Sequence, residues 1–403
     1  MRIACLHLPA FPLQVVLRAA PSFRSRGAAI AVVARTGVSP AVVSCSRAAR
    51  AAGVSVGMSA AVARMAPGVE IVTADPAAER DAARAVAEAL LALSPRVDVG
   101  GAPVGAHHAI YAEVPAKMRG ATFGARVRDL CDAIGVRGRI GIADDRFTAR
   151  VAATSSVGEG GVTSVPRGGS AAFLAPLPLS MLSLSAEVRH MLETLGIRTL
   201  GEFAALPPPE VARPEDADWH ALARGDGGAA LASFRPSGPI VERIAIADGE
   251  LVTAIGDLAV RIAARLEGRA QLAAAIELVL GDDTIEIVPD APIAEAQALA
   301  QLVSARFGGD TAGWPEVIEA RVTVIDRDAP VDVDGARDGV VGAPVLAEAS
   351  APLVLVPDVV AVVPREPHRR TRRGKERPRI DRRAAVRASA QPALFASLEA
   401  RAR

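Results

Sequence analysis

Short apolar runs alternate with longer segments in which apolar residues recur every three or four positions along the first 165 residues. A short apolar run bounded by Pro or Gly is typical of a buried strand, whereas the longer spacing is typical of an amphipathic helix. The runs predict strands at residues 2–8, 28–34, 41–46, 108–114 and 138–143, and helices at 47–54, 76–95, 120–135 and 145–156. This alternation predicts a layered α/β unit.

Two further units follow along the chain. Residues 184–206 predict two short helices joined at Gly196. Residues 239–328 predict strands at 239–247, 273–281, 284–289 and 317–326, with helices at 250–268 and 291–309, in the order β-α-β-β-α-β. Beyond about residue 328 the regular spacing fades, and Asp, Gly, Val and Pro dominate. We therefore expect a linker that leads into a basic tail.

The composition adds two points to this pattern. Half of the 403 residues are apolar but only 3% are aromatic, so the cores must be built from aliphatic side chains. The net charge of +1 is unevenly spread: residues 365–387 hold eleven basic against three acidic residues, a local excess of +8. Arginine outnumbers lysine. This bias suits bidentate phosphate contacts, although a GC-rich genome produces the same bias.

The cysteines and the N-terminal segment bear on the compartment. Cys5, Cys45 and Cys131 are odd in number and far apart, as expected of free thiols in a reducing cytoplasm. Pro9 and Pro12 interrupt the first apolar run, which does not read as an export signal. No apolar stretch reaches the length of a membrane span, so we expect a cytoplasmic protein with no membrane partner.

Three strings occur in an order that resembles the Y-family (translesion) DNA polymerases. They are "SCSRAARAAGVSVGMSAAVARMAPGVEIV" at 44–72, "GRIGIADDRFTARVAA" at 138–153 and "LETLGIRTLGEFAAL" at 192–206. The first is similar to the fingers segment of that family, the second to its G-I-x-x-N-K-x-x-A-K-I-A segment, and the third to its thumb. The β-α-β-β-α-β unit is similar to the little finger, so the resemblance covers about residues 1–328.

The resemblance implies an α+β multidomain chain. It would comprise a polymerase-like palm and fingers, a helical helix-hairpin-helix thumb, a β-α-β-β-α-β little finger and a disordered basic C-terminal tail. The implied bounds are 1–168 for palm and fingers (fingers about 20–75), 169–236 for the thumb, 237–328 for the little finger, 329–388 for the linker and basic tail, and 389–403 for a terminal peptide.

The chemistry of that family depends on carboxylates that this sequence lacks. Two Mg²⁺ ions need oxygen ligands, which the family supplies from a D-x-D-x-F-like string and from an Asp-Glu pair. Here the first string is "HLPAF", with His7 and Pro9 at the acidic positions. In "AHHAIYAEV", His108 and Ala109 occupy the positions of the pair. Imidazole is a poor Mg²⁺ ligand, so we expect the two-metal chemistry to be lost. No cofactor is then expected, and Mg²⁺ only if catalysis survives.

The basic residues of the nucleotide site are partly kept. Arg50 matches the arginine of the fingers helix, and Arg150 matches the lysine of the A-K-I-A string, so both are interpreted as remnants of a nucleotide-phosphate site. Pro12 replaces the aromatic residue that screens the sugar of the incoming nucleotide, and Arg47 replaces the fingers tyrosine. Displaced carboxylates that sustain an active translesion polymerase are the alternative, and Asp98 and Glu113 are the nearest candidates in the second region.

A polymerase-like chain without these carboxylates resembles the ImuB-type mutasome subunits, which serve as adaptors. That resemblance implies a non-catalytic protein that links the sliding clamp, DNA, an error-prone replicative-type polymerase and a RecA-like accessory protein in damage-induced mutagenesis. A plain DNA-binding protein with no link to replication is a third hypothesis.

The string "QPALF" near the C-terminus fits the adaptor hypothesis. Clamp-binding peptides have the form Gln-x-x-Leu-Phe, which matches Gln391, Leu394 and Phe395. The two apolar side chains would be buried in a cleft of the clamp, and a chance match or a short terminal helix is the alternative. The upstream arginines are expected to bind DNA phosphates, and a merely solubilising linker is the alternative. The candidate DNA-binding residues are Arg369, Arg370, Arg372, Arg373 and Lys375.

Overall fold

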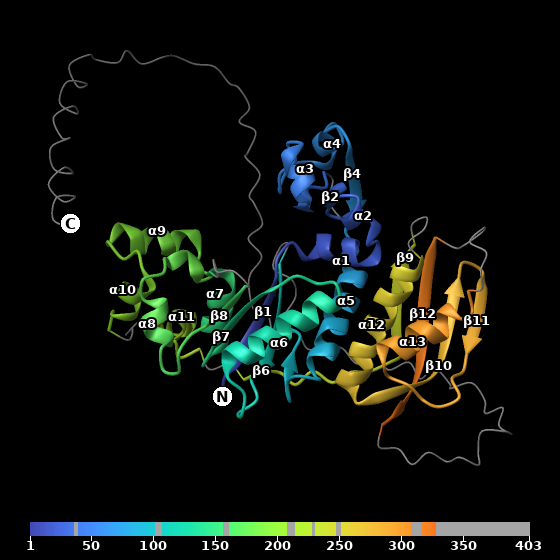
Figure 1. The fold of residues 1–403 in the computed structure, drawn as a ribbon. Helices are drawn as coiled ribbons and strands as arrows, with labels where there is room; N and C mark the ends of the chain where they lie inside the picture. Colours follow the sequence, from blue (N-terminus) through green and yellow to red (C-terminus); the bar gives the residue numbers. More distant parts are fainter. Residues whose placement is uncertain are drawn as a thin grey trace, which may run out of the picture. The chain divides into compact units, whose positions relative to one another are not determined.

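The computed structural model describes residues 1–35, 39–100, 107–155, 161–207, 214–227, 230–246, 251–307 and 316–327 of the chain. The described residues form three sheets and one helical segment (Figure 1). The tail residues predicted to contact DNA (Arg369, Arg370, Arg372, Arg373 and Lys375) and the clamp (Gln391, Leu394 and Phe395) lie outside the described residues. Those predictions stay predictions.

A five-stranded sheet carries the predicted α/β unit. It consists of β1 (Ile3–Leu8), β5 (Val97–Asp98), β6 (His108–Glu113), β7 (Arg139–Ala143) and β8 (Val162–Ser164), in the order β5-β6-β1-β7-β8. The central strand β1 is antiparallel to both β6 and β7. A strand with neighbours on both sides has all its backbone groups paired, which suits the buried apolar run that predicted it.

Helices cover both faces of this sheet. Helices α5 (Pro76–Leu90) and α6 (Gly120–Ala133) lie along one face, where Leu6, Leu8 and Phe123 belong to one buried cluster (Figure 1). Helix α7 (Arg146–Ser155) packs on the other face through small residues. A Cβ at Gly141 of β7 would meet the backbone of α7, so this close crossing requires glycine.

A three-stranded sheet is inserted between β1 and α5. It has the order β3-β2-β4, with β2 (Ala29–Val33), β3 (Val42–Cys45) and β4 (Val69–Thr73). Two short helices, α3 (Arg47–Ala51) and α4 (Ala60–Ala63), begin at Ser46 and Ser59, whose hydroxyls accept hydrogen bonds from backbone amides of the first turn. Helices α1 (Phe11–Ala19) and α2 (Ser22–Ser25) connect the two sheets along the chain.

The helical segment contains the predicted pair of short helices. These are α9 (Ala186–Thr194) and α10 (Leu200–Ala204), and Gly196 between them has φ +84°, a conformation that favours glycine. Thr199 and Glu202 form a capping box at the start of α10. The remaining elements are α8 (Ser170–Leu174), the 3₁₀ turn Leu179–Met181 and α11 (Pro214–Arg224).

The last described unit has the predicted β-α-β-β-α-β order. It consists of β9 (Ile240–Ala245), α12 (Leu251–Arg269), β10 (Gln271–Leu280), β11 (Asp283–Ile287), α13 (Ala296–Ser304) and β12 (Val317–Asp326). The four strands form an antiparallel sheet in the order β11-β10-β12-β9. Helix α13 begins later than residue 291, the predicted start, because Ile293 forms a β-bridge with Ala273.

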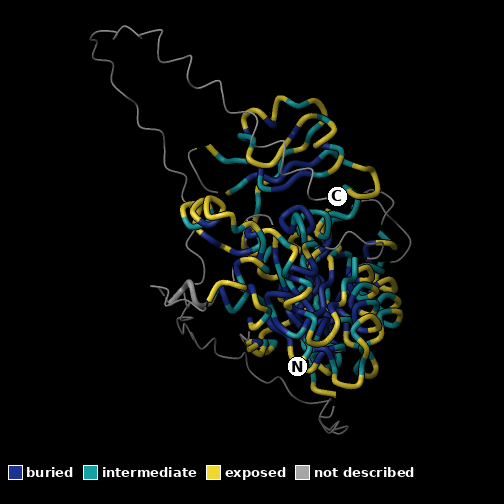
Figure 2. Tube along the Cα trace, turned by 90° about the vertical axis from the view of Figure 1, so that its left-hand side faces the viewer, coloured by how far each residue is buried: buried dark blue, intermediate teal, exposed yellow. Residues whose placement is uncertain are grey.

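Each sheet has its own apolar core. Figure 2 shows that buried positions alternate with exposed ones along the elements. Aliphatic residues dominate the core between α5, α6 and the five-stranded sheet and also the core under α12, as the low aromatic content predicts. None of the helices in the described ranges is long and apolar enough to cross a membrane.

A buried ion network joins α5 to α12. Glu88 accepts hydrogen bonds from Arg265 Nε and from Arg269 Nη2, each at 2.6 Å. Glu242 of β9 accepts from Arg265 at 3.0 Å and from Arg18 of α1 at 2.7 Å. A buried charge is stable only when it has a partner. These elements lie far apart in the sequence, and the pairing of their buried charges requires them to stay together.

Candidate functional site

The strand register brings three of the relevant positions into one row. His7 of β1 lies opposite Ala109 of β6 and opposite Arg139 of β7. Directly opposed residues in antiparallel strands point to the same face. His7 and Ala109, two of the positions at which the resemblance implies carboxylates, therefore share one face of the five-stranded sheet. Arg139 completes the row, and no motif in the sequence points to it.

The pleat identifies that face. Side chains alternate between faces along a strand, and Cys5, two residues before His7, lies in the cluster under α7. His7 therefore lies on the α7 face, beyond the small residues on which that helix packs. Arg150 of α7 is near enough for its charge to act on His7, and the ring centroid of His107 is 5.2 Å from that of His7.

His108 lies on the opposite face. Its side chain is 5% exposed and its ring stacks on Phe11 at a centroid distance of 5.2 Å, within the core that also contains Leu8. Neither ring nitrogen has a hydrogen-bond partner of normal geometry. Burial lowers the pKa of His108, with the Val99 carbonyl acting in the opposite direction, so the ring is a neutral core group. The structure thus separates His108 from His7 and Ala109.

Asp98, one of the two carboxylates proposed as replacement metal ligands, is already engaged in structural contacts. Asp98 of β5 is 5% exposed and pairs with Arg146 at 2.9 Å. Its oxygens also accept hydrogen bonds from the amides of Gly100 at 2.8 Å and Ala232 at 3.0 Å. The hydrogen bond from Ala232 holds the residues that follow α11 against the edge strand β5. Asp98 cannot serve as a metal ligand without giving up this buried pair.

Other acidic side chains near the ends of these strands also have structural partners. Asp144 pairs with Arg2 at 3.1 Å, and Asp145 accepts a hydrogen bond from the Thr148 amide at the start of α7. Glu113 lies 3.8 Å from Arg96. Within the described ranges, no group of three or more His, Cys, Asp or Glu side chains could hold a metal ion. The described side chains of this region therefore do not fit a two-magnesium site.

Positively charged side chains surround His7, at a position where the resemblance implies a carboxylate. The pKa of His7 is lowered to about 4, mainly by burial and further by His107, Arg139 and Arg150. A group whose charged neighbours all disfavour its protonation lies in a positive field. In the described part of the chain, neither Arg139 nor Arg150 has a carboxylate within 4.0 Å. We name His7, His107, Arg139 and Arg150 the basic cluster.

The buried thiol and phenol beneath the basic cluster are not reactive groups. Burial raises the pKa of Cys5 to about 12 and that of Tyr111 also to about 12. Arg146 lies over the Tyr111 ring at 4.1 Å from its centroid. A thiol or phenol with so high a pKa stays protonated at neutral pH, so these side chains contribute packing rather than a nucleophile.

The second predicted phosphate remnant lies in another element. Arg50 is exposed in the last turn of α3, beside the three-stranded sheet. Its positive charge counteracts the effect of burial, which raises the pKa of the Cys45 thiol. Pro12, predicted to replace a sugar-screening aromatic residue, is buried in the first turn of α1, where proline is well tolerated.

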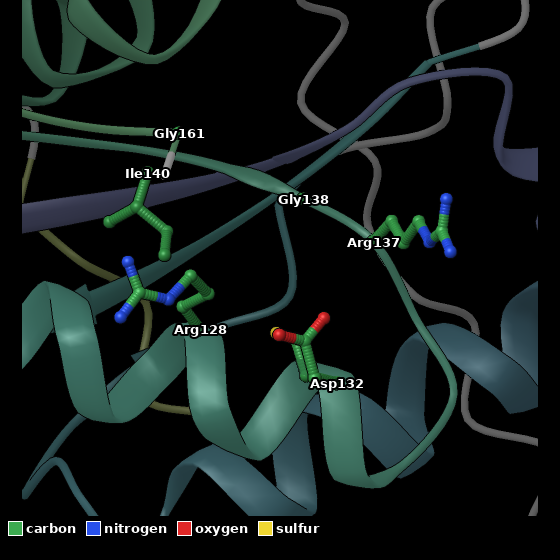
Figure 3. A pocket seen from close by; sticks show the side chains of 7 residues that line it. Arg128, Asp132, Arg137, Gly138, Ile140 and Gly161 are labelled. Atoms are coloured by element: carbon green, nitrogen blue, oxygen red, sulfur yellow. The ribbon is translucent and has the colours of Figure 1, made fainter. Parts of the chain in front are cut away.

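A hollow of about 210 Å³ lies between α6 and the chain that leads into β7 (Figure 3). Its lining includes Arg128 and Asp132 of α6, with Arg137 and Gly138 before β7. Figure 3 shows the Arg128 and Asp132 side chains rising from the same helix. With one carboxylate in its lining, this hollow is no substitute for a site that holds two magnesium ions.

The first part of the chain is similar to known proteins. Residues 6–154 match the sequence model of the impB/mucB/samB family. DNA polymerase IV of Dehalococcoides mccartyi strain CBDB1 is 35% identical over 101 residues, which is 25% of this chain and 24% of that protein. The same enzyme of strain 195 is 37% identical over 75 residues, 18% of this chain and 19% of that protein. The aligned region thus spans about a quarter or less of these relatives.

Solved structures of low identity are also similar. DinB from Sulfolobus solfataricus has a TM-score of 0.47 and 16% identity, with 81% of this chain and 99% of that chain covered. A post-insertion binary complex of Dbh DNA polymerase has a TM-score of 0.49 at the same identity, with 81% and 100% covered. The support for the family comes from the sequence match: residues 6–154 match the impB/mucB/samB family model, which confirms the predicted resemblance to Y-family DNA polymerases over that part of the chain.

Proposed function

We propose that this chain is a non-catalytic, Y-family polymerase-like adaptor. It links the sliding clamp, DNA, an error-prone replicative-type polymerase and a RecA-like accessory protein during damage-induced mutagenesis. The observation that carries the proposal is the pairing of His7 with Ala109 across β1 and β6, where metal-binding carboxylates are needed. The fact that Asp98 is already paired with Arg146 adds support.

The proposal assigns a role to each part of the chain. The five-stranded sheet would be the palm and the three-stranded sheet the fingers, within residues 1–168. Residues 169–236 would be the thumb and 237–328 the little finger. Residues 329–388 would be the linker and basic tail, and 389–403 the clamp-binding peptide.

The tail carries the contacts of the adaptor in this proposal. Gln391, Leu394 and Phe395 would dock on the sliding clamp, with the two apolar side chains buried in its cleft. Arg369, Arg370, Arg372, Arg373 and Lys375 would bind DNA phosphates without sequence preference. A tethered peptide of this kind gains effective concentration from the contacts made by the rest of the chain. The support is the sequence pattern.

An active translesion polymerase is the second candidate, and the DNA polymerase IV relatives favour it. In such an enzyme, Asp98 would have to give up its ion pair with Arg146 and its hydrogen bonds from the backbone amides of Gly100 and Ala232. Removing one member of a buried pair costs about 3–5 kcal/mol, which argues against this use of Asp98.

Primer extension separates the two functions. We expect no template-dependent incorporation by the purified protein with Mg²⁺ or Mn²⁺, because imidazole and methyl groups replace oxygen ligands. His7→Asp alone should also be inactive, since one ligand cannot hold two ions. Extension above background that Asp98→Asn abolishes would establish the polymerase instead. Clamp capture by the full chain, lost when Leu394 and Phe395 become Ala, distinguishes the adaptor from a plain DNA-binding protein.

A further inference from the structure

The basic cluster (His7, His107, Arg139 and Arg150) consists of side chains from β1, the start of β6, β7 and α7 on one face of the sheet. His7 and Arg139, 132 positions apart in the sequence, are therefore held together by rigid elements rather than by a loop. Arg139 and His107 are exposed, and His7 and Arg150 are half-buried. The cluster is thus both preformed and accessible to a ligand.

Other arginines of the same sheet and helix are neutralised. Arg2 pairs with Asp144, Arg96 lies near Glu113, and Arg146 pairs with Asp98. In the described ranges, the hydrogen bond of Arg139 is to the Thr154 carbonyl at 3.4 Å, and Arg150 lies over the Phe147 ring at 5.5 Å. Neither contact supplies an anion. Among the described residues, no carboxylate therefore pairs with the two arginines that produce the positive field at His7.

We infer that the basic cluster binds phosphate groups directly, without a bridging divalent cation. In a two-metal site, the cation joins protein carboxylates to phosphate oxygens, both of which are negative. Replacing the carboxylates by imidazole and methyl groups removes the ligands that hold the cation. Two guanidinium groups beside that place can then donate charge-assisted hydrogen bonds to phosphate oxygens themselves.

The inference rests on the proposed loss of the two-metal site, but it concerns binding rather than catalysis. The phosphate groups could belong to a DNA strand or to a nucleoside triphosphate, because both present the same oxygens. A DNA strand would be held along the sheet face, and a triphosphate would be held near the cluster alone. Two binding measurements distinguish these sources, and both use the full chain in the presence of EDTA.

The first measurement follows a short, fluorescent oligothymidylate by anisotropy over a range of salt concentrations. Each phosphate contact on a single strand contributes about 0.7 to the slope of log K against log salt. The variant R139Q/R150Q removes two such contacts, so the slope should be shallower by about 1.4 and the affinity at low salt should fall about tenfold or more. Arg126→Gln is the matched control, because Arg126 is an exposed arginine of α6, which covers the other face.

The second measurement uses thymidine triphosphate and the imidazole resonances of the protein. A bound anion favours the charged imidazole, so the pKa of His7, about 4 in the free chain, should rise when ligand is added. This readout uses the wild-type protein and does not depend on how well a variant folds. A rise with triphosphate alone assigns the cluster to a nucleotide, whereas a rise with oligothymidylate alone assigns it to a DNA strand.

The outcomes are separable. An unchanged salt slope and affinity in R139Q/R150Q, together with an unmoved His7 pKa with both ligands, overturns the inference while the adaptor proposal stands. Binding that is absent in EDTA and appears when Mg²⁺ is supplied in its place overturns the inference and also contradicts the lost two-metal site. Loss of binding in R139Q/R150Q with a melting temperature equal to that of Arg126→Gln supports the inference. If the double variant does not fold, the wild-type imidazole titration decides.

Discussion

Replacing Glu88 tests how much the buried ion network between α5 and α12 stabilises the described part of the chain. Its carboxylate accepts from Arg265 and Arg269 at 2.6 Å each, and all three side chains are less than a tenth exposed. Glu88→Gln keeps the shape and removes the charge. Of the two carboxylates of this network, Glu242, which pairs with Arg18 and Arg265, would then keep its charge.

The expected cost is large because the arginines stay buried. Breaking a buried pair by removing one partner costs about 3–5 kcal/mol, and the glutamine oxygen can still accept one hydrogen bond, so we expect about 3 kcal/mol. Arg261 shows how costly additional positive charge is here: burial first, and then Arg18, lower its pKa to about 10. A loss of about 3 kcal/mol corresponds to roughly two orders of magnitude in the equilibrium between the native and the disrupted state.

The assay is urea unfolding followed by circular dichroism, with hydrogen exchange of α12 amides as a local readout. Glu70→Gln is the control, because Glu70 pairs with Arg26 at 3.2 Å between side chains about half exposed. Such a pair contributes about 0–1 kcal/mol, and salt screens it. The effect of Glu88→Gln should persist at high salt. If the two variants differed by less than about 0.5 kcal/mol, the buried network would be no stronger than a surface pair, and this reasoning would be refuted.

Other predictions concern packing, pH and the tail. Gly268→Ala should destabilise the protein by about 1–3 kcal/mol or more in urea unfolding, because a Cβ there would meet the backbone of α5; Gly256→Ala, with open space around it, is the control. The pKa of His7 is about 4 in the folded chain, so the unfolded chain takes up the proton first as the pH falls. The free energy of unfolding should therefore be highest above about pH 6.5 and decrease by about 1–2 kcal/mol, after discounting for solvent screening, as the pH falls toward 4. His7→Gln should lack this decrease in pH-dependent melting. Replacing Leu394 and Phe395 by Ala should weaken clamp binding by roughly two to four decades at an unchanged melting temperature, and normal affinity would remove the peptide from the interface.

The local pattern was enough to predict most elements of the fold. The strands at β1, β6 and β7 and the helices α5, α6, α7 and α12 were each predicted within a few residues, because their apolar spacing is regular. The junction of two short helices at Gly196 was also predicted, and the positive φ of Gly196 is a finding of the structure. Helix α1 was missed, because Pro9 and Pro12 were read as breaks in an apolar run, although proline suits the first turn of a helix.

The candidate site was only partly predictable. The absence of an Asp at position 7 is visible in the sequence, and the structure places His7 on the α7 face, beside the basic cluster. The face of a strand on which a residue lies depends on its register, and neighbouring residues point in opposite directions. His108 and Ala109 therefore looked equivalent in the sequence, whereas the structure buries the first against Phe11 and places the second opposite His7.

Tertiary structure alone decided the contacts between distant residues. In the sequence, Glu88 looks like a solvated charge on an amphipathic helix, and its partner Arg265 lies 177 residues away. Arg139 looks like an ordinary residue before a buried strand until β7 pairs with β1. Local spacing determines which residues form a helix or a strand, because that choice depends on near neighbours. Which charges meet depends on how those elements pack, and no local pattern contains that information.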